Sequence, residues 1–246
     1  MNKKLAVVTG GIGGLGSAIC GALSAQGRRV VAVDLGNRDQ ALTRFRQESA
    51  ELEIDFQAID VSSFDDCSRG FSAIQERHGP IDILVNAAGI TRDASLRKMR
   101  VEDWRAVMAV DLDALFNTSR QVIDSMMERG FGRIVNISSV NGQTGQFGQT
   151  NYSAAKAGVH GFTMALAREG ARRGVTVNSI SPGYIDTDMT RAIRPDIREQ
   201  IVAGIPVGRM GHPRDIARTV AFLCADDSDY LTGANIPVNG GQFMSF

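Results

Sequence analysis

Short apolar runs and helical patterns alternate along almost the whole chain. Most of the apolar runs are continuous and rich in Val and Ile, which is typical of strands buried on both faces of a sheet. Seven such runs predict seven strands. They lie at Leu5–Thr9, Arg29–Asp34, Ile54–Asp60, Ile81–Asn86, Arg133–Ser138, Thr176–Ser181 and Asn235–Val238.

Helical patterns separate these runs, and several of them end at a glycine, which suits a left-handed C-cap. The alternation predicts an α/β fold, a Rossmann-type doubly wound parallel sheet of about seven strands with helices on both faces. No linker or repeat interrupts the chain, so we predict a single domain over residues 1–246. The predicted helices are Leu15–Gln26, Gln40–Ala50, Phe64–Arg77, Val101–Arg129, Asn151–Arg172 and Pro213–Ala225.

One segment breaks this rhythm. Residues 187–211 follow the sixth predicted strand and contain Pro195 and Pro206. An insertion of this length beyond the end of a strand often has a function of its own, and we predict a substrate lid there.

Composition narrows the class of protein. The formal net charge is zero, which argues against a nucleic-acid or membrane-surface partner, because both need a basic excess. Cys20, Cys67 and Cys224 are far apart and form no CxxC, so no disulfide framework is expected. No signal peptide or apolar run of membrane length is visible, and we expect a cytoplasmic protein. The three histidines are dispersed, so we predict no metal site.

The first predicted strand runs into a glycine-rich turn over 10–16, in which Gly11, Gly13 and Gly16 fit GxGxxG. Glycine permits positive φ and lets a pyrophosphate approach the backbone. The N-terminus of the following helix offers free N–H groups and a partial positive charge. This placement between a strand and a helix predicts a dinucleotide site, whereas the alternative is a tight turn without a ligand.

A carboxylate stands where the adenosine ribose of a bound dinucleotide would lie. Asp34 ends the second predicted strand, twenty residues past Gly14, where an acidic residue receives the ribose hydroxyls in NAD-binding proteins. The same charge repels a 2′-phosphate, so we predict that NAD(H) is preferred. Arg38 is close enough in sequence to reach a phosphate, which leaves NADP(H) open. The simpler interpretation is that Asp34 caps the next turn.

Three side chains suggest proton transfer. Tyr152 and Lys156 are four residues apart and share one face of a helix. A free phenol has a pKa of about 10, and a nearby ammonium favours the phenolate, so Tyr152 could exchange a proton with a carbonyl oxygen. Ser139, thirteen residues before Tyr152, could hydrogen-bond the same oxygen. A lone Tyr-x3-Lys is more simply explained by an amphipathic helix. Ser139, the glycine turn and the Asn-Ala-Ala-Gly segment at 86–89 favour catalysis instead.

The glycine turn, Ser139, Tyr152 and Lys156, in this order, resemble the short-chain dehydrogenase/reductase family over essentially the whole chain. The resemblance implies hydride transfer between a nicotinamide cofactor and a carbonyl compound, and it implies that Lys156 also holds the nicotinamide ribose. Through its TGxxxGxG, Asp-Val, Asn-Ala-Gly and Pro-Gly segments, it implies that the cofactor-binding residues are Gly10, Gly13, Gly14, Leu15, Gly16, Asp34, Asp60, Val61, Asn86, Ala87, Gly89, Tyr152, Lys156, Pro182, Gly183, Ile185 and Thr187.

The chain departs from the family pattern at one catalytic position. The family usually has an Asn in the long helix before the fifth strand, and the matching residue here is Asp111. In relatives that Asn acts partly through its backbone carbonyl, which binds a water that reaches the lysine. An Asp offers the same carbonyl but adds a negative charge near Lys156. We expect Asp111 to be a fourth catalytic residue and activity to survive the change.

The loop Gln146-Phe-Gly-Gln-Thr-Asn-Tyr152 leads into the catalytic tyrosine, and the segment Ile90-Thr-Arg-Asp93 follows the Asn-Ala-Ala-Gly turn. Both loops resemble those of acetoacetyl-CoA reductases of polyhydroxybutyrate synthesis. This resemblance implies reduction of the 3-oxo group of acetoacetyl-CoA to 3-hydroxybutyryl-CoA. A polar loop without substrate contact is the alternative for the residues before Tyr152. The implied substrate-binding residues are Asp93, Ser139, Gln146, Phe147, Gln149, Tyr152 and Tyr184.

Other functions stay open at this point. One alternative is a 3-oxoacyl-[acyl-carrier-protein] reductase. Such enzymes often carry a basic residue just before the fifth strand, where this chain has Gly130, although Arg173 is available at the other usual place. Another alternative is a protein that binds a nucleotide without catalysis. The resemblance also implies a homotetramer, built on the helical segments 101–129 and 151–172 and on the apolar end at 243–246.

Overall fold

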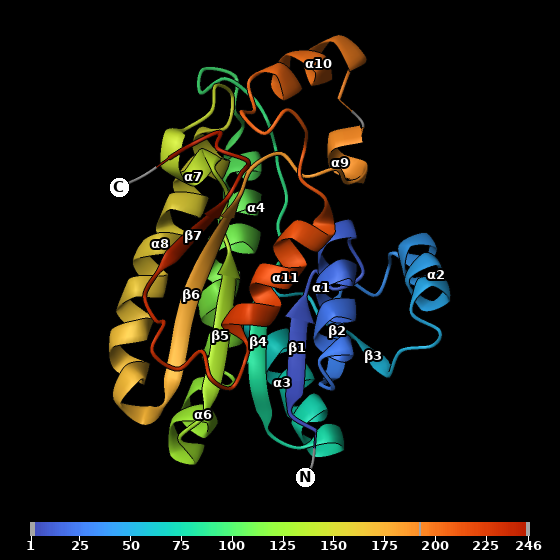
Figure 1. Ribbon diagram of the computed structural model, residues 1–246, viewed down its shortest axis with the longest axis vertical. Helices are drawn as coiled ribbons and strands as arrows, with labels where there is room; N and C mark the ends of the chain where they lie inside the picture. The colour runs from blue at the N-terminus through green and yellow to red at the C-terminus, as the bar shows by residue number, and fades with distance from the viewer. Residues whose placement is uncertain (1–2, 192, 245–246) are drawn as a thin grey trace.

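Seven parallel strands form one central sheet in the order β3-β2-β1-β4-β5-β6-β7 (Figure 1). The computed structural model describes residues 3–191 and 193–244. The strand order reverses between β1 and β4, and in doubly wound sheets ligands bind at such a point. The predicted Rossmann-type sheet is confirmed. The strands are β1 Leu5–Thr9, β2 Arg29–Asp34, β3 Ile54–Ala58, β4 Ile81–Asn86, β5 Gly132–Ile137, β6 Val175–Pro182 and β7 Asn235–Val238.

The central strand β1 shows why its apolar run is continuous. All five of its residues are buried. Ala6 and Val8 pack into the hydrophobic core on one face of the sheet, whereas Leu5 and Val7 pack into the core on the other. Successive side chains of a strand point to opposite faces, so a strand covered on both faces needs apolar residues at every position.

Helices cover both faces of the sheet, as predicted. Residues of α1, α2 and α11 enter one core, and residues of α3, α5, α6 and α8 enter the other. The α1 and α11 helices pack against each other along their lengths (Figure 1). The bounds of these outer helices are α1 Gly14–Ala25, α2 Asp39–Glu48, α3 Phe64–His78, α8 Thr150–Gly170 and α11 Pro213–Leu223.

The prediction of one helix over Val101–Arg129 was wrong, because this segment is interrupted twice. A π-helical segment, η1, replaces the α-helix at Ala109–Asp113, and the helix breaks again around Val122, whose φ is −123°. Thr118 Oγ1 donates a hydrogen bond of 2.7 Å to the Ala114 carbonyl, a contact that often bends helices. The resulting pieces are α4 Val101–Met108, η1 Ala109–Asp113, α5 Ala114–Ser119 and α6 Ile123–Arg129.

Three short helices were not predicted. They are polar, and the longest of them, α10, owes its start to Pro195 in its first turn rather than to an apolar stripe. No helix in the described ranges is both long and apolar enough to cross a membrane. Cys20, Cys67 and Cys224 are buried free thiols. The unpredicted helices are α7 Asn141–Thr144, α9 Asp188–Arg191 and α10 Pro195–Ala203.

Candidate active site

The glycine turn connects the carboxyl end of β1 to the start of α1 and forms a cradle of backbone atoms. Gly10 has a φ of +65°, and a Cβ at this position would lie 2.9 Å from the Ala87 oxygen. A Cβ on Gly16 would lie 2.1 Å from the Gly10 oxygen. Helix α1 has no side-chain cap and no acidic residue in its first turn, so its first N–H groups stay free for an anion. The turn therefore fits a dinucleotide pyrophosphate.

The end of β4 is tied to this turn. Thr9 Oγ1 accepts hydrogen bonds from the N–H groups of Ala87 and Ala88, at 3.1 and 3.2 Å. The Asn86 side chain is buried and donates to Asn136 Oδ1 at 2.9 Å, while it accepts from Thr118 at 2.8 Å. Asn86 therefore connects the end of β4 to β5 and α5 through buried hydrogen bonds. The turn that follows, with its exposed Gly89, is the part available to a ligand.

Asp34 lies buried at the end of β2 and is already paired. Both of its carboxylate oxygens lie 3.0 Å from Arg38 Nη1, and the Leu35 N–H donates to Oδ1 at 2.9 Å. The Arg38 side chain is 44% exposed, so the guanidinium borders solvent at this point. The pair places a carboxylate and a guanidinium together at the carboxyl end of β2.

Asp60 and Val61 follow β3 and shape the next turn. Asp60 Oδ1 accepts hydrogen bonds from the Ser62 N–H at 3.0 Å and from the Ser62 hydroxyl at 2.6 Å. The Val61 carbonyl accepts from Asn117 Nδ2 at 2.9 Å, and the Val61 side chain is buried. One oxygen of Asp60 therefore has a structural partner, while the side chain as a whole is exposed.

The ends of β5 and α8 bring the predicted proton-transfer residues into one region. Ser139 follows β5, and its hydroxyl accepts from the Asn141 N–H at 3.1 Å. On α8, Lys156 Nζ lies 5.5 Å from the centroid of the Tyr152 ring. Lys156 Nζ also donates to the Ile137 carbonyl at the end of β5, at 3.0 Å. This last bond holds the lysine of α8 against the strand that carries Ser139.

Lys156 forms a buried ion pair with Asp111 of the π-helical segment. Lys156 Nζ lies 3.1 Å from Asp111 Oδ1, and the Ile90 N–H donates to Oδ2 at 3.1 Å. Burial raises the pKa of Asp111, and Lys156 and the Ile90 N–H offset this only in part. Burial disfavours the Lys156 ammonium and is the largest single effect on it, but the charges of Asp111 and Tyr152 and the contact with Asp111 together outweigh burial and leave the pKa of Lys156 raised. The π-helical segment that carries Asp111 fits this picture, because π-helical turns are frequent at functional sites.

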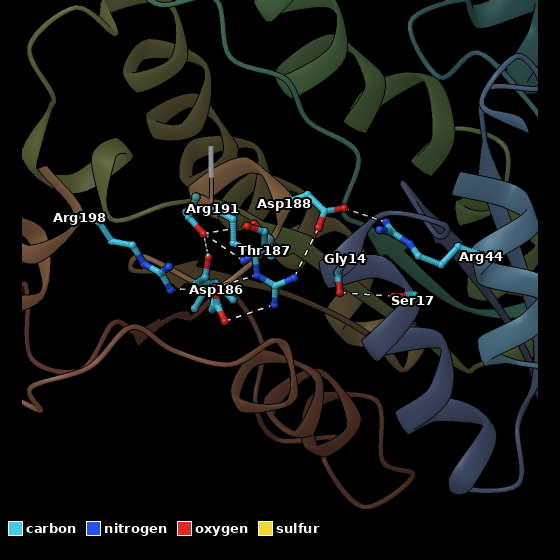
Figure 2. Close-up of polar contacts among 10 residues, drawn as sticks. Gly14, Ser17, Arg44, Asp186, Thr187, Asp188, Arg191 and Arg198 are labelled. Atoms are coloured by element: carbon cyan, nitrogen blue, oxygen red, sulfur yellow. Dashed lines mark hydrogen bonds and ion pairs between the residues drawn. The ribbon is translucent and has the colours of Figure 1, made fainter. Parts of the chain in front are cut away.

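The segment after β6 reaches the start of α1, where Thr187 and Gly14 lie near each other (Figure 2). A Cβ on Gly14 would lie 3.5 Å from Thr187, so the start of α1 and the Thr187 side chain are neighbours. Gly183 donates its N–H to the Val238 carbonyl at 3.1 Å, which fixes the Pro182-Gly183 turn against β7. The predicted residue Ile185 is buried and pairs with Gly211 in a short parallel bridge.

That bridge joins Gly211, the last residue of the predicted lid 187–211, to Ile185, which lies two residues before the lid begins. Ion pairs then hold α9 to its surroundings, as Figure 2 shows. Arg44 Nη2 of α2 lies 2.8 Å from Asp188 Oδ2, and Asp186 receives both Arg191 and Arg198, at 3.1 and 3.2 Å. The lid segment therefore contacts the body of the protein at its base and at α2.

Hydrogen bonds gather part of the predicted substrate residues at one rim. Asn141 Nδ2 donates to Gln149 Oε1 at 2.9 Å, and Gln149 Nε2 donates to Asp93 Oδ2 at 2.9 Å. Burial and the charge of Asp93 raise the pKa of Tyr184. In contrast, Gln146 is exposed and the Phe147 ring is 91% exposed, so neither is packed into the rim.

The structure adds residues that the sequence did not indicate. The Ser138 hydroxyl donates to the Lys156 carbonyl at 2.8 Å and lies 2.8 Å from His160 Nε2. His160 also lies 3.2 Å from the Ser181 hydroxyl, and burial lowers its pKa. Asn141 connects Ser139 to Gln149 as described above. No local pattern marks these residues, because their partners come from distant strands and helices.

Comparison with known proteins places this geometry in a family. A family model described as enoyl-(acyl carrier protein) reductase matches residues 10–242. The acetoacetyl-CoA reductase of Allochromatium vinosum is 57% identical over 98% of this chain and 99% of its own. That of Cupriavidus necator is 52% identical over 99% of this chain and 100% of its own. The crystal structure of gox2181 superposes with a TM-score of 0.91 at 32% identity, covering 98% and 96% of the two chains.

The resemblance expected from the sequence is confirmed, because the matches extend over nearly the whole chain and share its fold. Enzymes of this kind are oxidoreductases that use NAD(H) or NADP(H), and the cradle at the carboxyl end of β1 fits such a cofactor. With its parallel sheet, glycine turn, Ser139, Tyr152 and Lys156 in place, this chain belongs to the short-chain dehydrogenase/reductase family.

Proposed function

We propose that the protein reduces the 3-oxo group of acetoacetyl-CoA to the 3-hydroxy group. The observation that carries the chemistry is the buried Lys156 ammonium, which lies 5.5 Å from the Tyr152 ring and is bonded to the strand that leads to Ser139. The choice of substrate is supported by full-length likeness to two acetoacetyl-CoA reductases, at 57% and 52% identity.

Each of the three side chains has a distinct role in this proposal. The Tyr152 hydroxyl gives its proton to the 3-oxo oxygen as negative charge develops there. The Ser139 hydroxyl donates a hydrogen bond to the same oxygen. The Lys156 ammonium stabilises negative charge on Tyr152 and binds the nicotinamide ribose. The bound nicotinamide supplies the hydride.

The proposed contacts of the cofactor follow the carboxyl ends of the strands. The N–H groups at the start of α1 bind the pyrophosphate, because they are free and lie next to a glycine-rich turn. Asp34 binds the adenosine ribose. Asp60 and Val61 contact the adenine, and the segment from Pro182 to Thr187 holds the carboxamide. Ala87 and Gly89, in the turn after β4, contact the cofactor between the adenosine and the nicotinamide.

The rim that contains Asp93 and Gln149 is proposed to bind the acyl thioester together with Tyr184. Their amide and hydroxyl groups can bond the polar oxygens of a short 3-oxo acyl group. The exposed Phe147 ring and the neighbouring Gln146 would pack on the substrate when it enters. Residues 187–211 would close over the site as a lid, because the Ile185–Gly211 bridge already joins the end of this segment to the residues just before it.

The substrate is tested by steady-state kinetics with acetoacetyl-CoA and with an acetoacetyl thioester of acyl carrier protein. We expect kcat/KM to be higher for the CoA ester. A higher value for the carrier-protein ester would instead assign the chain to 3-oxoacyl-[acyl-carrier-protein] reduction. Cofactor binding without turnover of either ester would favour a nucleotide-binding protein without catalysis.

We expect kcat/KM to favour NADH over NADPH by at least about tenfold, which corresponds to roughly 1.4 kcal/mol. A 2′-phosphate carries a charge of about −1.5 to −2. In this proposal the phosphate would approach the buried carboxylate of Asp34. Like charges brought together can cost several kcal/mol, and Arg38 offsets part of this cost. The measurement is kcat/KM with each cofactor at fixed substrate concentration.

Three variants separate the contributions to this preference. Asp34→Gly should shift it toward NADPH, whereas Asp39→Asn, which removes an exposed carboxylate at the start of α2, should leave it unchanged. If the wild type already prefers NADPH and Arg38→Gln removes that preference, then Arg38 binds the phosphate and the proposed role of Asp34 is wrong.

We also propose a homotetramer. Phe116 on α5 and Met164 on α8 are 55% and 53% exposed, on the helices that the family resemblance places between subunits. Light scattering should give about four times the mass of one chain. Phe116→Arg should reduce this mass, and Leu96→Arg, at an exposed site outside these helices, should not. A stable, active monomer would contradict the proposal. Residues 245–246 of the expected apolar end lie outside the described residues.

A further inference from the structure

The ion pair between Asp111 and Lys156 is enclosed in the protein. The Asp111 side chain is 0% exposed and that of Lys156 is 5% exposed. Asp111 Oδ1 has the Lys156 ammonium as its only polar partner among the residues that the structure describes. A Cβ on Gly89 would lie 2.6 Å from this oxygen and 3.4 Å from Lys156 Nζ, so a glycine at position 89 leaves room for the pair.

Burial alone would work against the proposed roles of Lys156. A lysine that is removed from water tends to lose its proton, and fully buried lysines can have a pKa of about 5–6. The Ile137 carbonyl accepts one hydrogen bond from Nζ, but a carbonyl carries no net charge. A carboxylate in contact is the group that can keep a buried amine charged. Asp111 is the carboxylate in that position.

We propose that Asp111 is a positioning residue whose carboxylate keeps Lys156 charged and holds its ammonium beside Tyr152. The inference rests on the proposed roles of Ser139, Tyr152 and Lys156. It differs from a role for the backbone carbonyl of residue 111, because it requires the side-chain charge. An Asn at this position could accept a hydrogen bond from the lysine, but it has no negative charge to balance that of the ammonium.

Other titratable groups near the pair lie on α8, the helix of Lys156, or on the elements packed against it. Tyr152 and His160 lie one turn to either side of Lys156 on α8, and no other carboxylate among the described residues forms an ion pair with Lys156. The adjacent elements carry charged groups too, among them Asp103 on α4, Asp113 in η1, and Arg92 and Asp93 in the loop after β4.

The test measures the titration of Lys156 directly, in protein without cofactor or substrate. The chain has four lysines, so NMR of protein labelled with ¹³C at lysine Cε gives few signals, and Lys156→Met assigns the one of interest. We expect the Lys156 midpoint in the wild type to lie at or above the ordinary lysine pKa of about 10.4. In Asp111→Asn it should fall by at least about one pH unit.

Activity gives the second readout. The alkaline limb of kcat/KM should move to lower pH in Asp111→Asn, because a neutral Lys156 no longer fulfils its role. Asp113→Asn removes the same charge from the exposed side of the same π-helical segment and should move neither the NMR midpoint nor the limb.

The outcomes separate this inference from the proposed function. An unchanged Lys156 midpoint in a folded Asp111→Asn protein would overturn the inference, even if turnover fell, because a purely structural role predicts that result. If Asp111→Asn does not fold, a wild-type midpoint well below the ordinary lysine pKa would overturn it instead. Absence of reductase activity with an intact NMR shift would overturn the proposed function alone.

Discussion

Replacing Tyr152 with Phe should lower kcat by about 10²- to 10⁴-fold and leave cofactor affinity nearly unchanged. The change removes only the phenolic oxygen. The aromatic ring near Lys156 Nζ remains, as do the hydrogen bonds that hold Lys156 to the Ile137 carbonyl and its ion pair with Asp111. The measurement is steady-state turnover of acetoacetyl-CoA, combined with a binding titration of the reduced cofactor.

A matched control removes the same oxygen elsewhere. Tyr230 is fully exposed, so Tyr230→Phe should change neither turnover nor binding. A kcat loss of less than about tenfold in Tyr152→Phe, or roughly 1.4 kcal/mol, would show that another group transfers the proton. A large loss of cofactor affinity would instead show that the hydroxyl serves mainly in binding.

The fold was largely predictable because its strands are buried on both faces. Continuous apolar runs gave β1, β2, β4 and β7 with the bounds that the structure has, and the ends of β3, β5 and β6 differ by one or two residues. The segment 101–129 was not predictable in detail, since a π-helical turn and the break near Val122 keep the apolar spacing of a helix. Short polar helices such as α9 have too few apolar positions to produce a pattern.

For the candidate site too, contacts within one element were predictable and contacts between distant segments were not. Spacing within one element predicted that Tyr152 and Lys156 share a helix face, whereas the ion pair between Arg38 and Asp34 was not predicted. The bonds from Asn141 to Gln149 and on to Asp93 join three separate segments, so they depend on how distant parts of the chain pack. The sequence predicted a negative charge near Lys156, but only the structure shows that Asp111 is its buried partner.

Lys156→Met should cost about 3–5 kcal/mol of unfolding free energy at neutral pH, in addition to a severe loss of turnover. Methionine keeps most of the side-chain volume but removes the charge, so the Asp111 carboxyl group is left without its counter-charge in a site with 0% exposure. Exposed Lys98 provides the control, because Lys98→Met leaves no buried charge behind. Urea denaturation at fixed protein concentration measures both variants.

The pH dependence of this loss has a defined sign. Burial raises the pKa of Asp111 in the folded protein, and removal of Lys156 raises it further. A carboxyl group with a raised folded pKa destabilises the protein above its unfolded pKa of about 3.9, and protonation relieves this penalty. The gap between Lys156→Met and the wild type should therefore narrow as the pH falls from 7 toward 5.

A second substitution tests the cause. Asp111→Leu in the Lys156→Met background replaces the buried ion pair with apolar side chains, which is often neutral or stabilising. The double variant should recover most of the lost stability while its turnover stays low, because Lys156 is still missing. If the double variant is as unstable as Lys156→Met, the loss comes from packing around residue 156, and Asp111 carries no buried charge that needs a partner.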